Sequence, residues 1–125
     1  MISRRQARRQ ALFLLYQWDL SGQEIGSQYA EEIDPWAKAL AVETAANAAA
    51  LDERITAAAE GWTADRLGVV ERSALRVAIR ELELGEVPAE VAIDEAVAFA
   101  KRYASEDAAR LVNGILGRIQ REEAA

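Results

Sequence analysis

The chain has 125 residues, enough for one domain with a sizeable buried core. It contains no cysteine and no histidine, which excludes disulfides, thiolate nucleophiles, imidazole bases, zinc fingers and haem ligation. Only carboxylates remain as ligands for a hard metal such as magnesium. Because the sequence also lacks a signal-peptide pattern and any long apolar run, it predicts a cytoplasmic protein with no membrane contact, no cofactor and no bound metal.

The net charge of −6 argues at first sight against a nucleic-acid partner. The charge is unevenly distributed, however. Residues 1–11 carry four arginines and no acid, whereas residues 12–98 hold 6 basic and 17 acidic side chains. Residues 99–121 then carry five bases against two acids. Two basic ends therefore flank an acidic middle, and this asymmetry is the first indication of function.

The composition predicts helices throughout, because Ala, Leu, Glu and Arg dominate and no apolar alternation of period two is present. Ser3 is the expected N-cap of a first helix, which should end at Ser21 and Gly22 before a loop around Gly26. The tryptophans lie on apolar helical phases and are predicted to be core residues: Trp18, Trp36 and Trp62.

Asp34 before Pro35 marks the next helix start. Helical spacing of apolar residues then continues to Trp62, with an expected break near Asn47. A turn over residues 63–68 follows. The first half of the chain, about residues 1–60, is therefore expected to form one small helical bundle.

Apolar spacing from Val70 to Leu82 predicts a helix with Gly85 as its C′ residue, and Pro88 lies in or just after the next loop. Residues 91–100 form a further helix. Ser105 is the expected cap of the last helix, which contains Gly114. Close helix packing is the favoured explanation for that glycine, and approach of a ligand to the backbone is the alternative.

The sequence thus predicts an all-α single domain over residues 1–125. It has five long helical stretches, or six to seven helices with the short ones, and its second half spans about residues 64–121.

Four arginines near the N-terminus carry most of the functional signal: Arg4, Arg5, Arg8 and Arg9. Helical geometry places them on one strip beside the apolar face, continued by Leu12 and Tyr16. They lie at the positive end of the helix dipole, where cations are mildly unfavourable, so stability does not explain them. A phosphate backbone with bases stacked on Tyr16 would explain them. The alternatives are a solvated helix face, pairing with the acidic middle, and a membrane surface.

The acidic middle carries many carboxylates, among them Asp65, Glu71, Glu81 and Glu95. No clustered metal-binding motif, glycine-rich phosphate loop or nucleophile elbow accompanies them. A solvated surface or a docking surface for a basic protein is therefore favoured over catalysis, and we expect the protein not to be an enzyme.

Five segments together resemble the NusB transcription antitermination family: RRQARRQALFLLYQWD (4–19), WTADRL (62–67), VERSALRVAIREL (70–82), VPAEVAIDEAVAFAK (87–101) and VNGIL (112–116). Their order and spacing match from residue 4 to about 120. The resemblance implies two orthogonally packed small helical bundles. It also implies a factor that binds the boxA element of nascent ribosomal RNA transcripts together with ribosomal protein S10, within an RNA polymerase elongation complex that contains other Nus factors.

In the family the arginine-rich first helix contacts RNA, which carries over to Arg4, Arg5 and Arg8, with Arg9 and Tyr16 as companions. A second family contact at the start of the last helix carries over to two further positions and a preceding lysine: Asp107, Leu111 and Lys101. Asp107 could equally be a first-turn acid that stabilises its helix. Leu111 stands where the family typically has phenylalanine, Gly117 replaces a usual aspartate, and Asp94 replaces a common asparagine.

The S10 surface is expected around Asp65, Arg66 and Glu71, and Glu71 is the favoured single contact because a basic ribosomal protein would complement it. Two alternatives remain. One is the NusB-like domain of an rRNA cytosine-5 methyltransferase, which would require a downstream catalytic domain with cysteines. The other is a structural helical homodimer in which a second copy buries Leu12, Phe13 and Tyr16.

Overall fold

The computed structural model describes residues 2–124 and contains six α-helices and one short 3₁₀ helix, η1, with no β-strand among those residues. The all-α prediction is confirmed. In chain order the elements are α1 (Arg4–Ser21), α2 (Pro35–Ala46), α3 (Ala48–Ala58), η1 (Ala64–Arg66), α4 (Val69–Leu84), α5 (Ala89–Tyr103) and α6 (Glu106–Ala124).

Most of the predicted helix ends are confirmed by the cap geometry. The Ser3 side chain accepts a hydrogen bond from the Gln6 backbone N–H, and the Gln6 side chain accepts one from the Ser3 N–H. The Asp34 carboxylate accepts hydrogen bonds from the first turn of α2. The remaining boundaries also lie where expected: Gly22 after α1, Asn47 between α2 and α3, Gly85 after α4 and Ser105 before α6.

Two expectations about the end of α3 and one about α6 are wrong. α3 ends at Ala58, because the backbone leaves the helical conformation at Ala59, with φ of −93° and ψ of 81°. Gly61 then turns the chain in a left-handed conformation with φ of 80°. Trp62 consequently lies outside the helix and is 51% exposed, whereas Trp18 and Trp36 pack half-buried against the core. In α6, a Cβ built on Gly114 meets nothing within 4 Å, so close helix packing does not explain this glycine.

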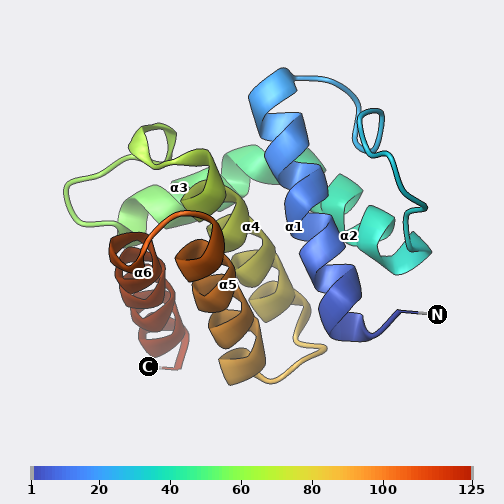
Figure 1. The fold of residues 1–125 in the computed structure, drawn as a ribbon. Helices are drawn as coiled ribbons and strands as arrows, with labels where there is room; N and C mark the ends of the chain where they lie inside the picture. Colours follow the sequence, from blue (N-terminus) through green and yellow to red (C-terminus); the bar gives the residue numbers. More distant parts are fainter. Residues whose placement is uncertain (1, 125) are drawn as a thin grey trace.

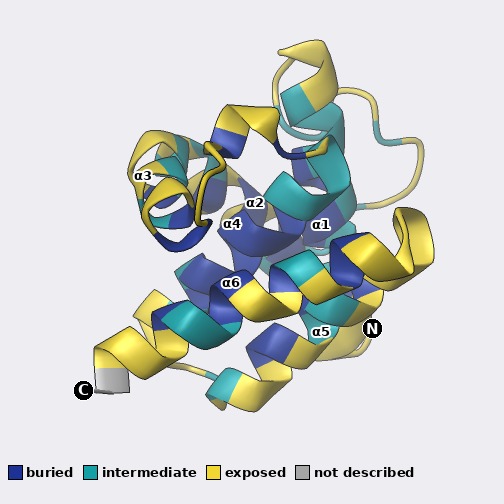
Figure 2. Cartoon of the chain, turned by 90° about the vertical axis from the view of Figure 1, so that its left-hand side faces the viewer, coloured by how far each residue is buried: buried dark blue, intermediate teal, exposed yellow. Residues whose placement is uncertain are grey.

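α4 is the central element of the fold. It packs against all five other α-helices, and Figure 1 shows it between α1 and α2 on one side and α6 on the other. The buried hydrophobic residues form one cluster with members from α1 to α6. Figure 2 colours most of α4 as buried, whereas buried and exposed residues alternate along α5 and α6. The two halves of the chain therefore share a single core.

None of the described helices is both long and apolar enough to cross a membrane. Ser3 and Gly22 cap the two ends of α1, and the helix packs against α2 and α4. Side chains of α1 form the candidate site.

Candidate nucleic-acid interface

The four arginines of α1 separate into two pairs. Arg4 and Arg8 are directed towards α2 and α4, whereas Arg5 and Arg9 lie on the side of α1 that meets α5. The prediction of one continuous arginine strip is therefore wrong, because Arg4 and Arg8 contact residues of α2 and α4, whereas Arg5 pairs with Glu95 of α5.

Arg8 is buried. Its guanidinium donates to the carboxylate of Glu81 on α4 through Nε at 2.5 Å and through a second nitrogen at 2.9 Å. Both side chains are only 4% exposed. The bidentate pair uses two of the five N–H donors of Arg8, and its burial leaves almost none of the guanidinium accessible to a ligand. Leu12, which was expected to extend the strip, is also buried and belongs to the core.

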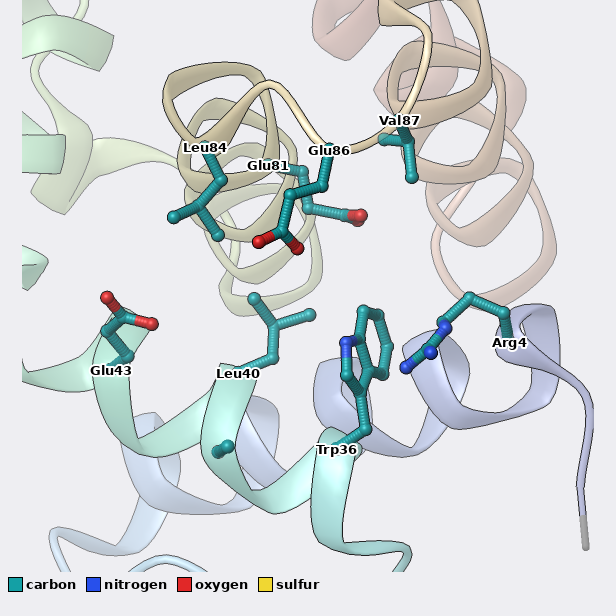
Figure 3. A pocket seen from close by; sticks show the side chains of 9 residues that line it. Arg4, Trp36, Leu40, Glu43, Glu81, Leu84, Glu86 and Val87 are labelled. Atoms are coloured by element: carbon teal, nitrogen blue, oxygen red, sulfur yellow. The ribbon is translucent and has the colours of Figure 1, made fainter.

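Arg4 is exposed but engaged. Its guanidinium carbon lies 4.2 Å from the centroid of the Trp36 ring, a cation–π contact. Figure 3 shows the two side chains facing each other at one end of a cavity of about 370 Å³, with Leu40 and Leu84 beyond them. Arg4 thus covers an aromatic ring of α2 and points away from α5.

Arg5 and Phe13 join α1 to α5 along a row with helical spacing. Arg5 Nε lies 2.9 Å from Glu95 Oε1. Two turns further on, the Phe13 ring lies 5.4 Å from Phe99 and 4.9 Å from Tyr103, both in edge-to-face geometry. Arg9 stands between Arg5 and Phe13 on this row, half-buried, and forms no ion pair with any residue from 2 to 124.

The same side of the molecule carries further cationic and aromatic groups. Arg102 is exposed and lies 5.5 Å from the Tyr103 ring, which is itself 38% exposed. Helical spacing places the half-buried Tyr16 on the same side of α1 as Arg9. We call this surface the α1–α5 face, made of Arg5, Arg9, Phe13, Tyr16, Arg102 and Tyr103.

Sequence reasoning missed Tyr103. The available signal was the spacing of Phe99 and Tyr103, four residues apart with a cation beside them, which places two rings on one side of a helix. The spacing alone does not show that these rings meet Phe13, because that contact depends on the position of α5 beside α1.

The other predicted RNA residues lie elsewhere. Lys101 lines a cavity between α5 and α6 and is 3.8 Å from Glu106. Asp107 pairs with Arg110 in the first turn of α6, and Leu111 packs half-buried against the core. These residues lie at the end of α5 and the start of α6, next in the chain to Arg102 and Tyr103 of the α1–α5 face.

The predicted S10 surface is exposed at Asp65 and Arg66 on η1. The hydroxyl of Thr63 donates a hydrogen bond to Asp65, which lowers the pKa of that carboxyl and keeps it ionised. Glu71 folds back over Gly68 at the start of α4, where the helix dipole favours a negative charge. The three residues lie close together in the chain around one helix start.

Arg72 holds this segment in place and was not singled out by the sequence. Its guanidinium lies 2.8 Å from Asp19 at the end of α1 and donates to the backbone carbonyls of Ala64 and Leu67. One turn further along α4, Arg76 forms a bidentate pair with Asp52 of α3. η1 is thus tied to α1 and α4 by a partly buried arginine.

No group of three or more acidic side chains that could hold a metal ion occurs among the described residues. The chemistry available on the α1–α5 face is recognition of anions and aromatic rings. Arg9 and Arg102 pair with no carboxylate of the described residues, Arg5 is largely exposed beside Glu95, and ring surfaces are accessible next to them.

Comparison with known proteins points to one family. The NusB family profile matches residues 5–121. The chain is 37% identical to the transcription antitermination protein NusB of Solibacter usitatus, covering 98% of this chain and 91% of that protein. It is 39% identical to the NusB of Salinispora tropica, covering 95% and 96%. A chain in the crystal structure of the antitermination factors NusB and NusE in complex with dsRNA superposes with a TM-score of 0.83 and 31% identity, covering 95% of this chain and 96% of that one.

Proposed function

Because the chain belongs to the NusB family, we propose that it is a transcription antitermination factor that binds boxA RNA of nascent ribosomal transcripts on its α1–α5 face. Its protein partner is NusE, ribosomal protein S10, and the pair acts within the RNA polymerase elongation complex alongside other Nus factors. The structure of NusB and NusE with dsRNA supports both partners. The protein works by binding, in the cytoplasm, and makes or breaks no bond.

The observation that carries this proposal is the combination of free cations and rings on the α1–α5 face. Arg9 and Arg102 form no ion pair with the described residues, and Arg5 is 67% exposed although it contacts Glu95. Arginine binds phosphate in a bidentate manner, and single-stranded RNA stacks its bases on aromatic side chains. Tyr103 and Tyr16 supply such surfaces between the cations.

The proposed RNA residues therefore differ from the sequence expectation at Arg8. A phosphate could reach Arg8 only by breaking its buried pair with Glu81, which would leave a buried carboxylate without a partner. Arg4 remains exposed beside the face and can add long-range attraction to the RNA. Lys101, Asp107 and Leu111 remain proposed contacts at the start of α6.

For S10 we propose docking on η1 and the start of α4, with Asp65, Arg66 and Glu71 as contacts. The surrounding chain is acidic, which complements a basic ribosomal protein and speeds association. A homodimer that buried Phe13 and Tyr16 would cover the α1–α5 face and compete with RNA. Leu12 could not contribute to that dimer, because the core of one copy already buries it.

The direct test removes the two arginines that face α5. We expect Arg5→Ala with Arg9→Ala to weaken binding of a boxA oligonucleotide at least tenfold while leaving helicity and S10 binding unchanged. The matched control is Lys38→Ala with Arg54→Ala, which changes the net charge equally but lies outside the face. Fluorescence anisotropy with and without S10 measures both. If the two double variants bind RNA equally well, the α1–α5 face is not the RNA site.

A further inference from the structure

A groove of about 420 Å³ is lined by residues from the end of α3, the turn that follows it, and α6. Its walls include Trp62 from the turn after α3 and Leu111, Gly114, Arg118 and Arg121 from α6. It shares no residue with the α1–α5 face. Three features of this groove indicate a ligand.

The first feature is the exposure of Trp62. Tryptophan is usually well buried, yet half of this side chain is accessible to solvent. The turn that exposes Trp62 has a defined backbone conformation. Gly61 is left-handed, and the Trp62 N–H donates a hydrogen bond to the Ala59 carbonyl at 2.8 Å. An exposed indole held by its backbone beside cations is suited to stack a base.

The second feature is Gly114. A glycine inside a helix lowers helix stability, and here no neighbouring atom requires it, since a Cβ would point into open space. Leaving out the side chain keeps the wall of the groove flat next to the backbone of α6. A flat ligand such as a nucleobase makes use of such a wall.

The third feature is the charge along the same side of α6. Arg118 and Arg121 follow Gly114 by four and seven residues, which places all three on one side of the helix. Arg118 is held by Glu60 at 2.7 Å and by Glu122 at 3.1 Å. Arg121 forms no ion pair with any of the described residues, so one cation at this end of the groove is free for a phosphate.

We propose that this groove is an RNA subsite in which one unpaired base stacks on Trp62 against Gly114 while Arg121 binds an adjacent phosphate. The inference deepens the proposed function and rests on it. Leu111 gives the groove an apolar wall without an aromatic ring. Trp62, on the opposite side, supplies the ring surface that Leu111 does not.

Gly114→Leu gives the sharpest test because its effects on stability and binding have opposite signs. The leucine fills the groove and also removes a helix-destabilising glycine, so we expect a higher melting temperature together with at least fivefold weaker binding of a single-stranded boxA oligonucleotide. Gln120→Leu is the matched control, since it places the same side chain on an exposed position of α6 outside the groove. Equal RNA affinity of these two variants would overturn the proposal.

The stacking role of Trp62 is tested by removing or replacing its aromatic ring. Trp62→Ala should weaken RNA binding by a similar factor with circular dichroism unchanged, and Trp62→Phe should retain most of the affinity because a ring remains. A series of oligonucleotides, each with one abasic nucleotide at a different position, should identify the stacked base. At that position, loss of the base should lower the affinity of the parent protein but not that of Trp62→Ala.

The outcomes separate this inference from the function on which it rests. If the parent binds no boxA RNA with or without S10, both fail. If Arg5→Ala with Arg9→Ala loses RNA binding while Trp62→Ala and Gly114→Leu bind as the parent does, only the groove assignment fails. If these two variants weaken S10 binding and leave RNA binding without S10 intact, the groove is a protein-docking surface and the proposal is wrong.

Discussion

Arg5 and Arg8 lie three residues apart on α1 and both contact a glutamate on another helix, yet their surroundings differ completely. Arg8 and Glu81 are each 4% exposed, whereas Arg5 is 67% exposed and Glu95 is 19% exposed. The closest N–O distances are similar, 2.5 Å and 2.9 Å. Distance alone therefore says little about what an ion pair does, and burial decides it.

The physical reason lies in the competition with water. An exposed pair gains little over two hydrated ions and exchanges readily with another anion such as a phosphate. A buried pair has already lost its water, so removing one partner leaves the other without compensation. Arg8 is thus committed to holding α1 against α4, and Arg5 is free to change partners.

The largest predicted effect breaks the buried pair. Glu81→Ala should lower the free energy of unfolding by about 3–5 kcal/mol, because the Arg8 guanidinium is left buried and unpaired. Replacing both partners, Arg8→Met with Glu81→Leu, should recover most of that loss since no charge remains inside. Urea unfolding followed by circular dichroism measures both. A cost below about 1 kcal/mol for the single variant would mean that the pair is not closed in solution.

An intermediate effect is expected for Arg72, whose pair with Asp19 is neither buried nor open, with side chains 12% and 16% exposed. Arg72→Met should cost about 1–3 kcal/mol, because it also removes the side-chain donor to the carbonyls of Ala64 and Leu67. S10 affinity should fall with it if η1 is part of that surface, which isothermal titration at a temperature below unfolding would measure. Lys38→Met on α2 serves as the control. Unchanged S10 affinity in folded Arg72→Met would remove η1 from the proposed interface.

The sequence was informative wherever the determining interactions are local. Ser3, Asp34 and Gly85 act on residues within one turn, so their cap roles could be read directly and are confirmed. Arg8 and Glu81 are 73 residues apart, and a helical projection of α1 cannot tell which neighbour will cover which arginine. Trp62 was misplaced for a related reason, because helical spacing continues past the point where Gly61 turns the chain.

The same distinction applies to the candidate site. The arginine run and Tyr16 were visible as a pattern, while the contribution of Tyr103 depends on α5 lying along α1. No sequence pattern indicates the role of Arg72. That role depends on two backbone carbonyls and a carboxylate that only the fold brings together. Site residues that act through packing are the ones that sequence reasoning does not find.

A smaller effect, on the salt dependence of RNA binding, should distinguish Arg5 from Arg8. Each phosphate contact on single-stranded nucleic acid adds about −0.7 to the slope of log K against log salt concentration. Arg5→Ala should therefore make the slope of boxA binding shallower by about that amount. The double variant Arg8→Met with Glu81→Leu should keep the parent slope, because Arg8 is buried and our proposal gives it no phosphate contact. Affinities measured at several salt concentrations decide this, and a shallower slope for the double variant would return Arg8 to the RNA site.

The smallest predicted effect concerns Glu95, the carboxylate that competes with RNA for Arg5. Because the Arg5–Glu95 pair is largely exposed at the arginine, Glu95→Gln should change the free energy of unfolding by less than about 1 kcal/mol. It also removes a negative charge next to the phosphate path and frees the guanidinium, so RNA affinity should rise by about two- to threefold, the range expected for release of an exposed pair. Glu90→Gln, an exposed acid five residues earlier on α5, controls for the change in net charge. If Glu95→Gln instead weakens RNA binding, Glu95 positions Arg5 for the phosphate, and the exposed pair is then as much a part of the binding surface as the arginine itself.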